Sequence, residues 1–210
     1  MIITRQIILT ANSRHPTAEL TAMKMTLALA QFKITDPRSA GALLANLTVE
    51  SGIIPKREDL YYRTADRLMA VFPSTFDPAH GGRFSAAPYL GNPVALGNLV
   101  YAGKLGNGDV ASGDGYRNRG GGYVQITGEA NYLLAGQLIG QPLGQRPELI
   151  EQIGVSCQAG CAYWTRMSSA DQLARQGNIA GTRYAVNGRA GLGMAEMLAV
   201  YQRLFPLLST

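Results

Sequence analysis

The chain has 210 residues, of which 46% are hydrophobic and 16% are charged. This composition excludes a disordered chain and predicts a globular protein of one domain, or of one domain with two lobes. The net charge of +5 favours an anionic partner. The positive charges are scattered along the sequence, so no nucleic-acid partner is expected.

Helical patterns dominate the chain. The first half predicts helices at 4–13, 17–33, about 36–50, 64–72 and 92–101. A glycine-rich loop at 103–122 and a short extended piece at 123–127 follow. Helices then return at about 129–138, 147–152, 154–167, 169–176, 178–187 and 193–207. Strand signals are weak throughout, so the fold class is predicted to be mainly α, with little or no β structure.

Two of these helices carry clear apolar or capping signals. The helix at 17–33 has an apolar stripe made by Leu20, Met23, Leu27, Leu29 and Ala30. The next helix begins at Asp36-Pro37, a capping side chain followed by proline in the first turn, and Gly52 ends it. The apolar stripe of that helix ends at Leu47, and Glu50 lies three residues further on, at the flank of the stripe. We therefore expect a partly buried carboxyl group, an environment that favours the protonated acid.

Several classes of protein are excluded by what the chain contains. Arg14 and His15 interrupt the first apolar segment, which predicts an amphipathic helix and no signal peptide. The apolar runs are all shorter than the ~18 residues that span a membrane. Cys157 and Cys161 share one helix face and are interpreted as small buried residues. Neither a metal site nor a cofactor is expected.

The reactive side chains of this sequence favour catalysis by carboxyl groups over other hydrolytic mechanisms. The two histidines, His15 and His80, both lie in turns, and neither is near a nucleophile motif. Glycoside hydrolysis needs one protonated and one ionised carboxyl group. Glu50 fits the first role, and Glu58, which lies in a polar turn, fits the second. Asp59 is an alternative to Glu58 that spacing cannot separate from it.

The loop at 113–128 is the second concentration of functional residue types. It contains the aromatic residues Tyr116 and Tyr123, the amide Gln125 and the hydroxyl of Thr127. Aromatic faces and amides are what a sugar-binding groove uses, so Tyr116, Tyr123 and Gln125 are predicted to bind substrate. The alternative is an ordinary anchored loop. For Arg117 and Arg119 that alternative, structural salt bridges, is favoured.

From about residue 20 to 205 the chain resembles glycoside hydrolase family 19, the chitinase-like family, and within it the phage endolysins. Glu50-Ser51-Gly52 is similar to the segment that carries the family's general acid. The most specific similarity runs from Ser112 to Gly120 and on through Gln125-Ile-Thr-Gly128 and Asn131-Tyr132. Tyr184-Ala-Val-Asn-Gly188 resembles a late family element.

The resemblance implies roles for individual residues. Glu50 is implied as the general acid, Glu58 as the general base, and Thr127 as the residue that holds the attacking water. Asn131 and Asn187, together with Gln125, are implied to line the substrate groove. The implied fold is a lysozyme-like and chitinase-like helical fold in which two lobes flank that groove.

The chain also departs from the family pattern. Val49 replaces a histidine before the acid, Ile53 replaces a frequent glycine, and Arg189 replaces a glycine after Asn187. In the loop, Asn118 and Gly121 replace an aromatic residue and an arginine. Both glutamates remain, but sugar specificity cannot be copied from plant chitinases.

The expected function is that of an endolysin-type glycosidase, which hydrolyses the glycan strands of bacterial peptidoglycan by an inverting mechanism. Three alternatives stay open: a chitinase, a non-catalytic glycan-binding module, and a lytic transglycosylase that leaves anhydro-sugar ends.

The expected organisation is a single catalytic domain that acts as a monomer. Its main lobe is predicted at about 1–70 and 115–210, and a smaller helical lobe, which could contact the wall, at about 71–114. Peptidoglycan strands are the expected partner. Because no signal peptide is predicted, the protein is expected in the host cytoplasm until a holin-like lesion releases it to the periplasm and cell wall.

Overall fold

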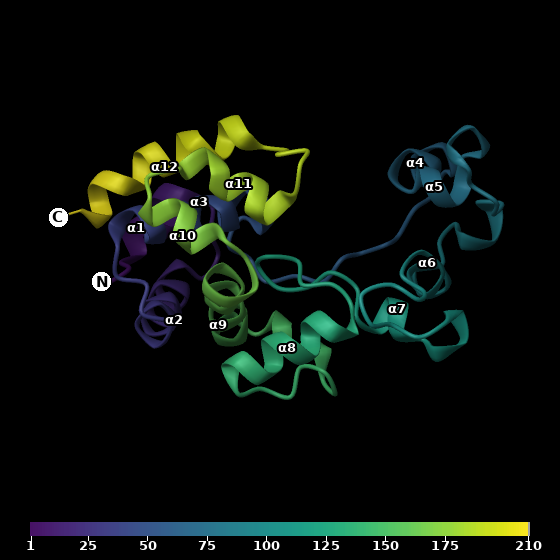
Figure 1. The fold of residues 1–210 in the computed structure, drawn as a ribbon, viewed down its shortest axis with the longest axis horizontal. Coiled ribbons are helices and arrows are strands. Elements are labelled where there is room, and N and C mark those ends of the chain that lie inside the picture. Colours follow the sequence, from purple (N-terminus) through teal and green to yellow (C-terminus); the bar gives the residue numbers. More distant parts are fainter. Residues whose placement is uncertain (210) are drawn as a thin grey trace. The chain divides into compact units, whose positions relative to one another are not determined.

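A computed structural model describes residues 1–209 of the chain (Figure 1). The described residues form two compact units. Unit 1 comprises Met1–Lys56, Gly121–Gln125 and the chain from Ala135 onward, and unit 2 comprises Arg57–Gly120 and Ile126–Leu134.

Unit 1 consists almost entirely of helices. They are α1 (Arg5–Ala11), α2 (Ala18–Gln31), α3 (Pro37–Ser51), η4 (Pro147–Glu151), α9 (Ile153–Ala162), the π-helical η5 (Tyr163–Met167), α10 (Ala170–Arg175), α11 (Ile179–Asn187) and α12 (Met194–Leu208). Unit 2 contains shorter pieces, which are α4 (Ala65–Val71), α5 (Pro73–Phe76), η1 (Pro78–His80), η2 (Ala87–Tyr89), α6 (Pro93–Val100), η3 (Val110–Ser112) and α7 (Asp114–Arg117). Helix α8 (Glu129–Ile139) begins in unit 2 and ends in unit 1.

The predicted mainly α class is confirmed, and no β-strand forms anywhere in residues 1–209. The predicted helices are confirmed to within a few residues at their ends. The extended piece predicted at 123–127 is wrong, because residues 122–125 form a turn in which Gln125 has a left-handed φ of 54°. The predicted helix at 154–167 changes to π-helical geometry at Tyr163.

Helix α3 is the centre of unit 1. Every residue from Ser39 to Leu47 is buried, as expected for a helix enclosed on all sides. Helices α10, α11 and α12 pack against it (Figure 1). Gly41 allows α12 to come close, because a Cβ atom there would lie 3.1 Å from the Tyr201 ring.

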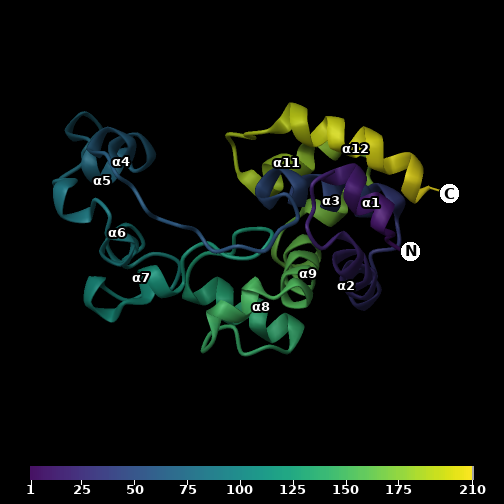
Figure 2. The ribbon, with the colours of Figure 1, turned by 180° about the vertical axis from the view of Figure 1, so that it is seen from behind.

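Most of the predicted apolar stripe of α2 faces solvent, and of its five members Leu29 alone is buried. Leu20, Met23 and Leu27 are 41%, 56% and 63% exposed. The buried face holds small residues and two larger ones, namely Ala18, Thr21, Ala22, Met25, Ala28 and Leu29. This face packs against α9, which runs beside α2 in the view from behind (Figure 2). Small side chains on both helices allow close approach, so size rather than hydropathy selects the buried face.

Unit 2 has a small core of its own, formed by Leu60, Leu68, Phe76, Ala86, Leu96 and Val100. Helices α6 and α7 meet at two glycines, since a Cβ atom on Gly115 would lie 2.4 Å from the Gly97 carbonyl oxygen. The unit is larger than the smaller lobe predicted at 71–114: it also takes in 57–70, 115–120 and 126–134. The reason is that Leu60 and Leu68 belong to this core.

None of the helices in the described part of the chain combines the length and the apolar character needed to cross a membrane. Cys157 and Cys161 are both buried and unpaired, as predicted. Burial raises the pKa of both thiols above their ordinary value.

Candidate active site

Glu50 occupies the last turn of α3 and is paired with a buried arginine. Its side chain is 16% exposed, and its Oε1 accepts a 2.6 Å hydrogen bond from Nη1 of Arg183, whose side chain is 3% exposed. The predicted partial burial is thus confirmed. A carboxylate at the C-terminal end of a helix is disfavoured by the helix dipole, and the guanidinium compensates for this placement.

Arg183 is a residue that the sequence reasoning missed. It lies on α11, and it also donates to Oδ1 of Asn46 at 3.3 Å and to the carbonyl of Leu192 at 2.6 Å. Asn46 in turn donates to Thr182 Oγ1 at 3.1 Å. One guanidinium therefore links the end of α3, helix α11 and the loop that follows α11.

We expect Arg183→Met to destabilise the chain by about 3 kcal/mol, because it leaves a partly buried carboxylate without its cation and removes the donor to three acceptors. Urea unfolding measures the change. The matched control is Arg146→Met, whose partner is Glu148 in a pair that is more than half exposed. We expect this control to change stability by less than about 1 kcal/mol. Equal effects of the two substitutions would contradict the role given to Arg183.

The chain leaves α3 through a tightly held turn. Gly52 ends the helix with a φ of 67°, and Ile53 follows with a φ of 57° although it is β-branched and fully buried. The Gly52 carbonyl accepts from Asn12 Nδ2 at 2.9 Å, and the Ile53 carbonyl lies 2.8 Å from Nε2 of the buried His15. The connection between α1 and α2 thereby fixes the end of the helix that carries Glu50.

Glu58 lies in unit 2, where Tyr101 holds its carboxylate. The Tyr101 hydroxyl lies 3.0 Å from Oε1 and 2.8 Å from Oε2 of Glu58. Burial, together with the charge of Glu58, raises the pKa of Tyr101, so this hydroxyl remains a donor over the physiological range. Glu58 is half-buried, whereas Asp59 is exposed. The structure thus gives the two candidate bases different surroundings.

Arg119 fixes the backbone around Glu58. Its Nε donates to the Glu58 carbonyl at 2.8 Å and its Nη1 to the Tyr116 carbonyl at 2.9 Å. The Arg119 guanidinium also stacks on the Tyr116 ring, 3.9 Å from the centroid. Arg119 was predicted to have a structural role through salt bridges. These contacts give it a structural role, but its partners are backbone carbonyl groups and an aromatic ring. Tyr116 is half-buried, and the guanidinium covers one face of its ring, so only the other face remains for the predicted sugar contact.

Thr127 and Asn131 lie together in unit 2. Thr127 is half-buried, and its carbonyl accepts from Asn131 Nδ2 at 2.8 Å. Asn131 thus holds the backbone at the start of α8. The adjacent Gly128 N–H donates to the Asn118 carbonyl at 2.8 Å, and Asn118 is itself buried. The backbone at position 118 therefore anchors the segment that carries Thr127.

Tyr123 does not fit its predicted role. It is 1% exposed and packs in the core of unit 1, where its hydroxyl lies 3.8 Å from the Cys157 sulfur. Burial is the main reason that its pKa is raised. A ring enclosed in this way has no face for a sugar, so the prediction that Tyr123 binds substrate is corrected. Gly121 and Gly122 lead the chain inward at this point, and both are buried.

Gln125 and Asn187 both contact neighbouring backbone in unit 1. The Gln125 amide donates to the Gly122 carbonyl at 2.9 Å. Asn187 Oδ1 accepts from the Leu192 N–H at 2.9 Å, across the loop at 188–193. Both residues are half-buried. These contacts hold two turns in place and do not test the predicted contact with substrate.

The predicted site residues are divided between the units. Glu50, Tyr123, Gln125 and Asn187 belong to unit 1, and Glu58, Tyr116, Thr127 and Asn131 belong to unit 2. Within residues 1–209 there is no cluster of three histidine, cysteine, aspartate or glutamate side chains that could hold a metal ion.

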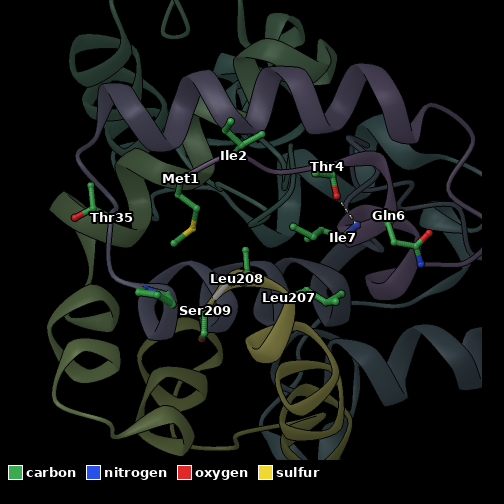
Figure 3. A pocket seen from close by; sticks show the side chains of 10 residues that line it. Met1, Ile2, Thr4, Gln6, Ile7, Thr35, Leu207, Leu208 and Ser209 are labelled. Atoms are coloured by element: carbon green, nitrogen blue, oxygen red, sulfur yellow. Dashed lines mark hydrogen bonds between the residues drawn. The ribbon is translucent and has the colours of Figure 1, made fainter.

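Unit 1 has a hollow of about 630 Å³ near the start of the chain (Figure 3). Met1, Ile2 and Ile7 line it together with Leu207 and Leu208 of α12. The Thr4 hydroxyl, also in its wall, accepts from the Ile7 N–H at 3.3 Å and so caps α1. The lining is largely apolar and contains no predicted site residue, so acid–base chemistry is not expected in this hollow.

No family model matches the chain. A curated protein of Haemophilus influenzae, described as a glycosyl hydrolase family 19 domain-containing protein, is 30% identical to it over 120 residues. The match covers 57% of this chain and spans 57% of the length of that relative.

Two solved structures share the fold. Chitinase C from Streptomyces griseus superposes with a TM-score of 0.62 at 18% identity, covering 99% of this chain and 77% of the other. A mutant of chitinase C gives a TM-score of 0.60 at 17% identity, covering 99% of this chain and 93% of the other. The chitinase-like helical fold is therefore confirmed, and the curated relative supports the resemblance to family 19 indicated by the sequence motifs.

Proposed function

We propose that this chain is a glycoside hydrolase of the family 19 type that cuts the glycan strands of bacterial peptidoglycan. The observation that carries the proposal is that a neighbouring side chain holds each of the two glutamates: Glu50 is paired with Arg183, and Glu58 accepts hydrogen bonds from Tyr101. Each carboxylate has a fixed orientation set by a buried or half-buried partner, as acid–base catalysis requires. The similarity to family 19 supplies the reaction class.

In the proposed mechanism, Glu50 donates a proton to the glycosidic oxygen as the bond from that oxygen to the anomeric carbon breaks. Arg183 donates to Oε1 of Glu50, so we assign the transferable proton to Oε2. The guanidinium then stabilises the carboxylate that remains after proton transfer.

Glu58 acts as the base in this scheme. It accepts a proton from a water whose oxygen attacks the anomeric carbon on the opposite face, which inverts its configuration. The proposal gives Thr127 the task of holding this water. Tyr101 orients the Glu58 carboxylate, and after turnover the proton on Glu58 exchanges with solvent. Inverting glycosidases place the two carboxyl groups about 6.5–9.5 Å apart to admit the water.

The preference for peptidoglycan is supported by the net charge of +5, which suits an anionic polymer. We further propose that the chain acts as a phage endolysin that reaches the wall during host lysis. Expression in a Gram-negative host tests this part: cells should lyse only when a holin or another membrane lesion is supplied, and lysis without a lesion would contradict it.

Product analysis tests the reaction itself. Purified chain is incubated with purified peptidoglycan and, separately, with chitin, and the products are identified by mass spectrometry and reducing-end assay. We expect muropeptides with ordinary reducing ends. Release of oligosaccharides from chitin alone would indicate a chitinase. Both structural neighbours carry that name. Anhydro-sugar ends would indicate a lytic transglycosylase, and binding without new reducing ends would leave a glycan-binding module.

A further inference from the structure

A second hollow in unit 1, of about 590 Å³, has a different chemistry from the proposed active site. Besides Phe32 and Thr165, its lining consists of three cations, one carboxylate and two amides, namely Lys33, Arg166, Arg175, Asp171, Gln172 and Gln176. None of these residues takes part in the proposed hydrolysis.

The hollow carries uncompensated positive charge. Arg175 Nε pairs with Asp171 Oδ2 at 2.9 Å. For Lys33 and Arg166, by contrast, the described chain provides no ion pair. Two cationic side chains beside a concave surface attract an anion, and the guanidinium forks and amides offer donors for its oxygens.

Hydrogen bonds from buried residues hold the part of the lining that carries Arg175. The indole N–H of Trp164 donates to Ser39 Oγ at 2.9 Å, and the Ser39 hydroxyl donates to Asp171 Oδ1 at 2.5 Å. Trp164 and Ser39 are both buried. This chain of bonds fixes the Asp171 carboxylate, which in turn orients Arg175. A preorganised cation loses less freedom when a ligand binds.

Two local departures from ordinary helical structure occur in the lining. Arg166 lies in the π-helical stretch η5, and such stretches are frequent at functional sites. Lys33 has a left-handed φ of 55° just after α2. Its N–H bonds to the Ala30 carbonyl at 3.2 Å, and the Ile34 N–H bonds to the Leu29 carbonyl at 2.9 Å. This is a Schellman helix stop, where glycine is the residue the backbone favours.

Lysine at that stop weakens folding relative to glycine. The Lys33 side chain is exposed, so burial does not offset the strain. A residue that is unfavourable for its backbone conformation, and whose side chain buries little surface, is expected where the side chain serves another purpose. Here that side chain contributes a positive charge to the rim of the hollow.

We propose that this hollow is an accessory site for carboxylate groups on the peptide stems of the cell wall. The proposal rests on the proposed function, because it takes peptidoglycan as the polymer. The stems carry carboxylates at intervals along each glycan strand, so a site of this kind holds the chain to an insoluble substrate while the active site works. The amides of Gln172 and Gln176 suit peptide groups beside the carboxylate.

The test compares the full-length chain with the double variant Lys33→Gly and Arg166→Ser. Binding is measured by co-sedimentation with purified sacculi on ice, with intact sacculi and with sacculi from which an amidase has removed the stems. At about 50 mM salt we expect the double variant to bind intact sacculi about tenfold more weakly. We expect both proteins to bind stripped sacculi equally weakly.

The control variant Arg14→Ser and Arg203→Ser removes the same net charge from two exposed positions outside the hollow, and it should bind intact sacculi within about twofold of the unchanged chain. Lys33→Gly alone should leave the melting temperature equal or higher, which separates lost binding from lost folding. Equal binding by the double variant and the control would overturn the proposal. So would full binding of the unchanged chain to stripped sacculi.

Two further readings separate the possible failures. In a competition experiment, inorganic phosphate and glutarate are added to the bound chain at the same ionic strength. Displacement of the chain from sacculi by phosphate but not by glutarate would overturn the carboxylate assignment. On soluble glycan strands from which the amidase has removed the stems, the double variant should match the hydrolysis rate of the unchanged chain, and a lower rate would place these residues in the active site. If the unchanged chain hydrolyses no glycan, the proposed function fails, yet the sedimentation result can still be judged.

Discussion

Glu50→Gln is expected to reduce hydrolysis of peptidoglycan by about 10³-fold or more, because an amide cannot donate the proton that the leaving oxygen needs. The substitution keeps the shape of the side chain, and its carbonyl oxygen can still accept from Arg183. Loss of turbidity of permeabilised Gram-negative cells gives a first measurement, and release of reducing ends from purified peptidoglycan gives the rate.

The loss of activity in Glu50→Gln can be assigned to catalysis when the variant is also shown to be folded. Arg183 loses the charge of its partner in this variant, so stability should fall by about 1–3 kcal/mol, and circular dichroism at the assay temperature must show the native helical signal. Clearing of cells by Glu50→Gln at the rate of the unchanged chain would end the assignment of Glu50 as the acid. An acceptable control is Glu19→Gln, which removes one exposed carboxylate from α2 and should leave the rate unchanged.

Glu58→Gln is expected to lower the hydrolysis rate by about 10²–10³-fold, while Asp59→Asn changes it by less than about threefold. The reason is the difference in their surroundings: Tyr101 donates to Glu58, whereas Asp59 is exposed. Both variants remove one negative charge from adjacent positions, so each serves as the control for the other. The rate of reducing-end release measures the effect.

A rate loss confined to Asp59→Asn would transfer the role of base to Asp59. Azide offers a second readout, because a small anion can replace the attacking water when the base is missing. If Glu58 is the base, azide should restore turnover to Glu58→Gln and yield a glycosyl azide of inverted configuration. A purely structural role for Glu58 predicts no such rescue.

The fold was largely predictable because most helices carry their own start, stop and apolar signals. Asp36 and Pro37 begin α3 and Gly52 ends it, as the sequence predicts. The orientation of α2 was not predictable by the same rule. Leu20, Met23 and Leu27 point outward although they are large and apolar, because the packing against α9 depends on the sizes of side chains on a second helix. A pattern within one helix contains no information about its partner.

The site residues show a similar division. The half-buried position of Glu50 followed from its place beside the apolar stripe of α3. Tyr123 was misjudged because an aromatic residue in a glycine-rich loop has the same local pattern whether it faces a groove or the core. Arg183 was missed because arginine is usually exposed. Its spacing, four residues after Ile179 and three before Val186, placed it on the face that packs against the core and was the available signal.

Ile53, the residue that leaves α3 with a left-handed backbone, has a consequence for which substitutions the chain tolerates. Glycine would relieve about 1–2 kcal/mol of backbone strain there, but it would also leave empty the volume of a fully buried isoleucine side chain, worth about 1.5–3 kcal/mol in transfer alone. Asparagine tolerates the same φ but would bring an amide into the core. Restoring the family glycine by a single exchange is therefore expected to be close to neutral or to destabilise the chain by up to about 2 kcal/mol. A larger neighbouring core residue would recover the lost packing, so this position and its packing partners are expected to change together.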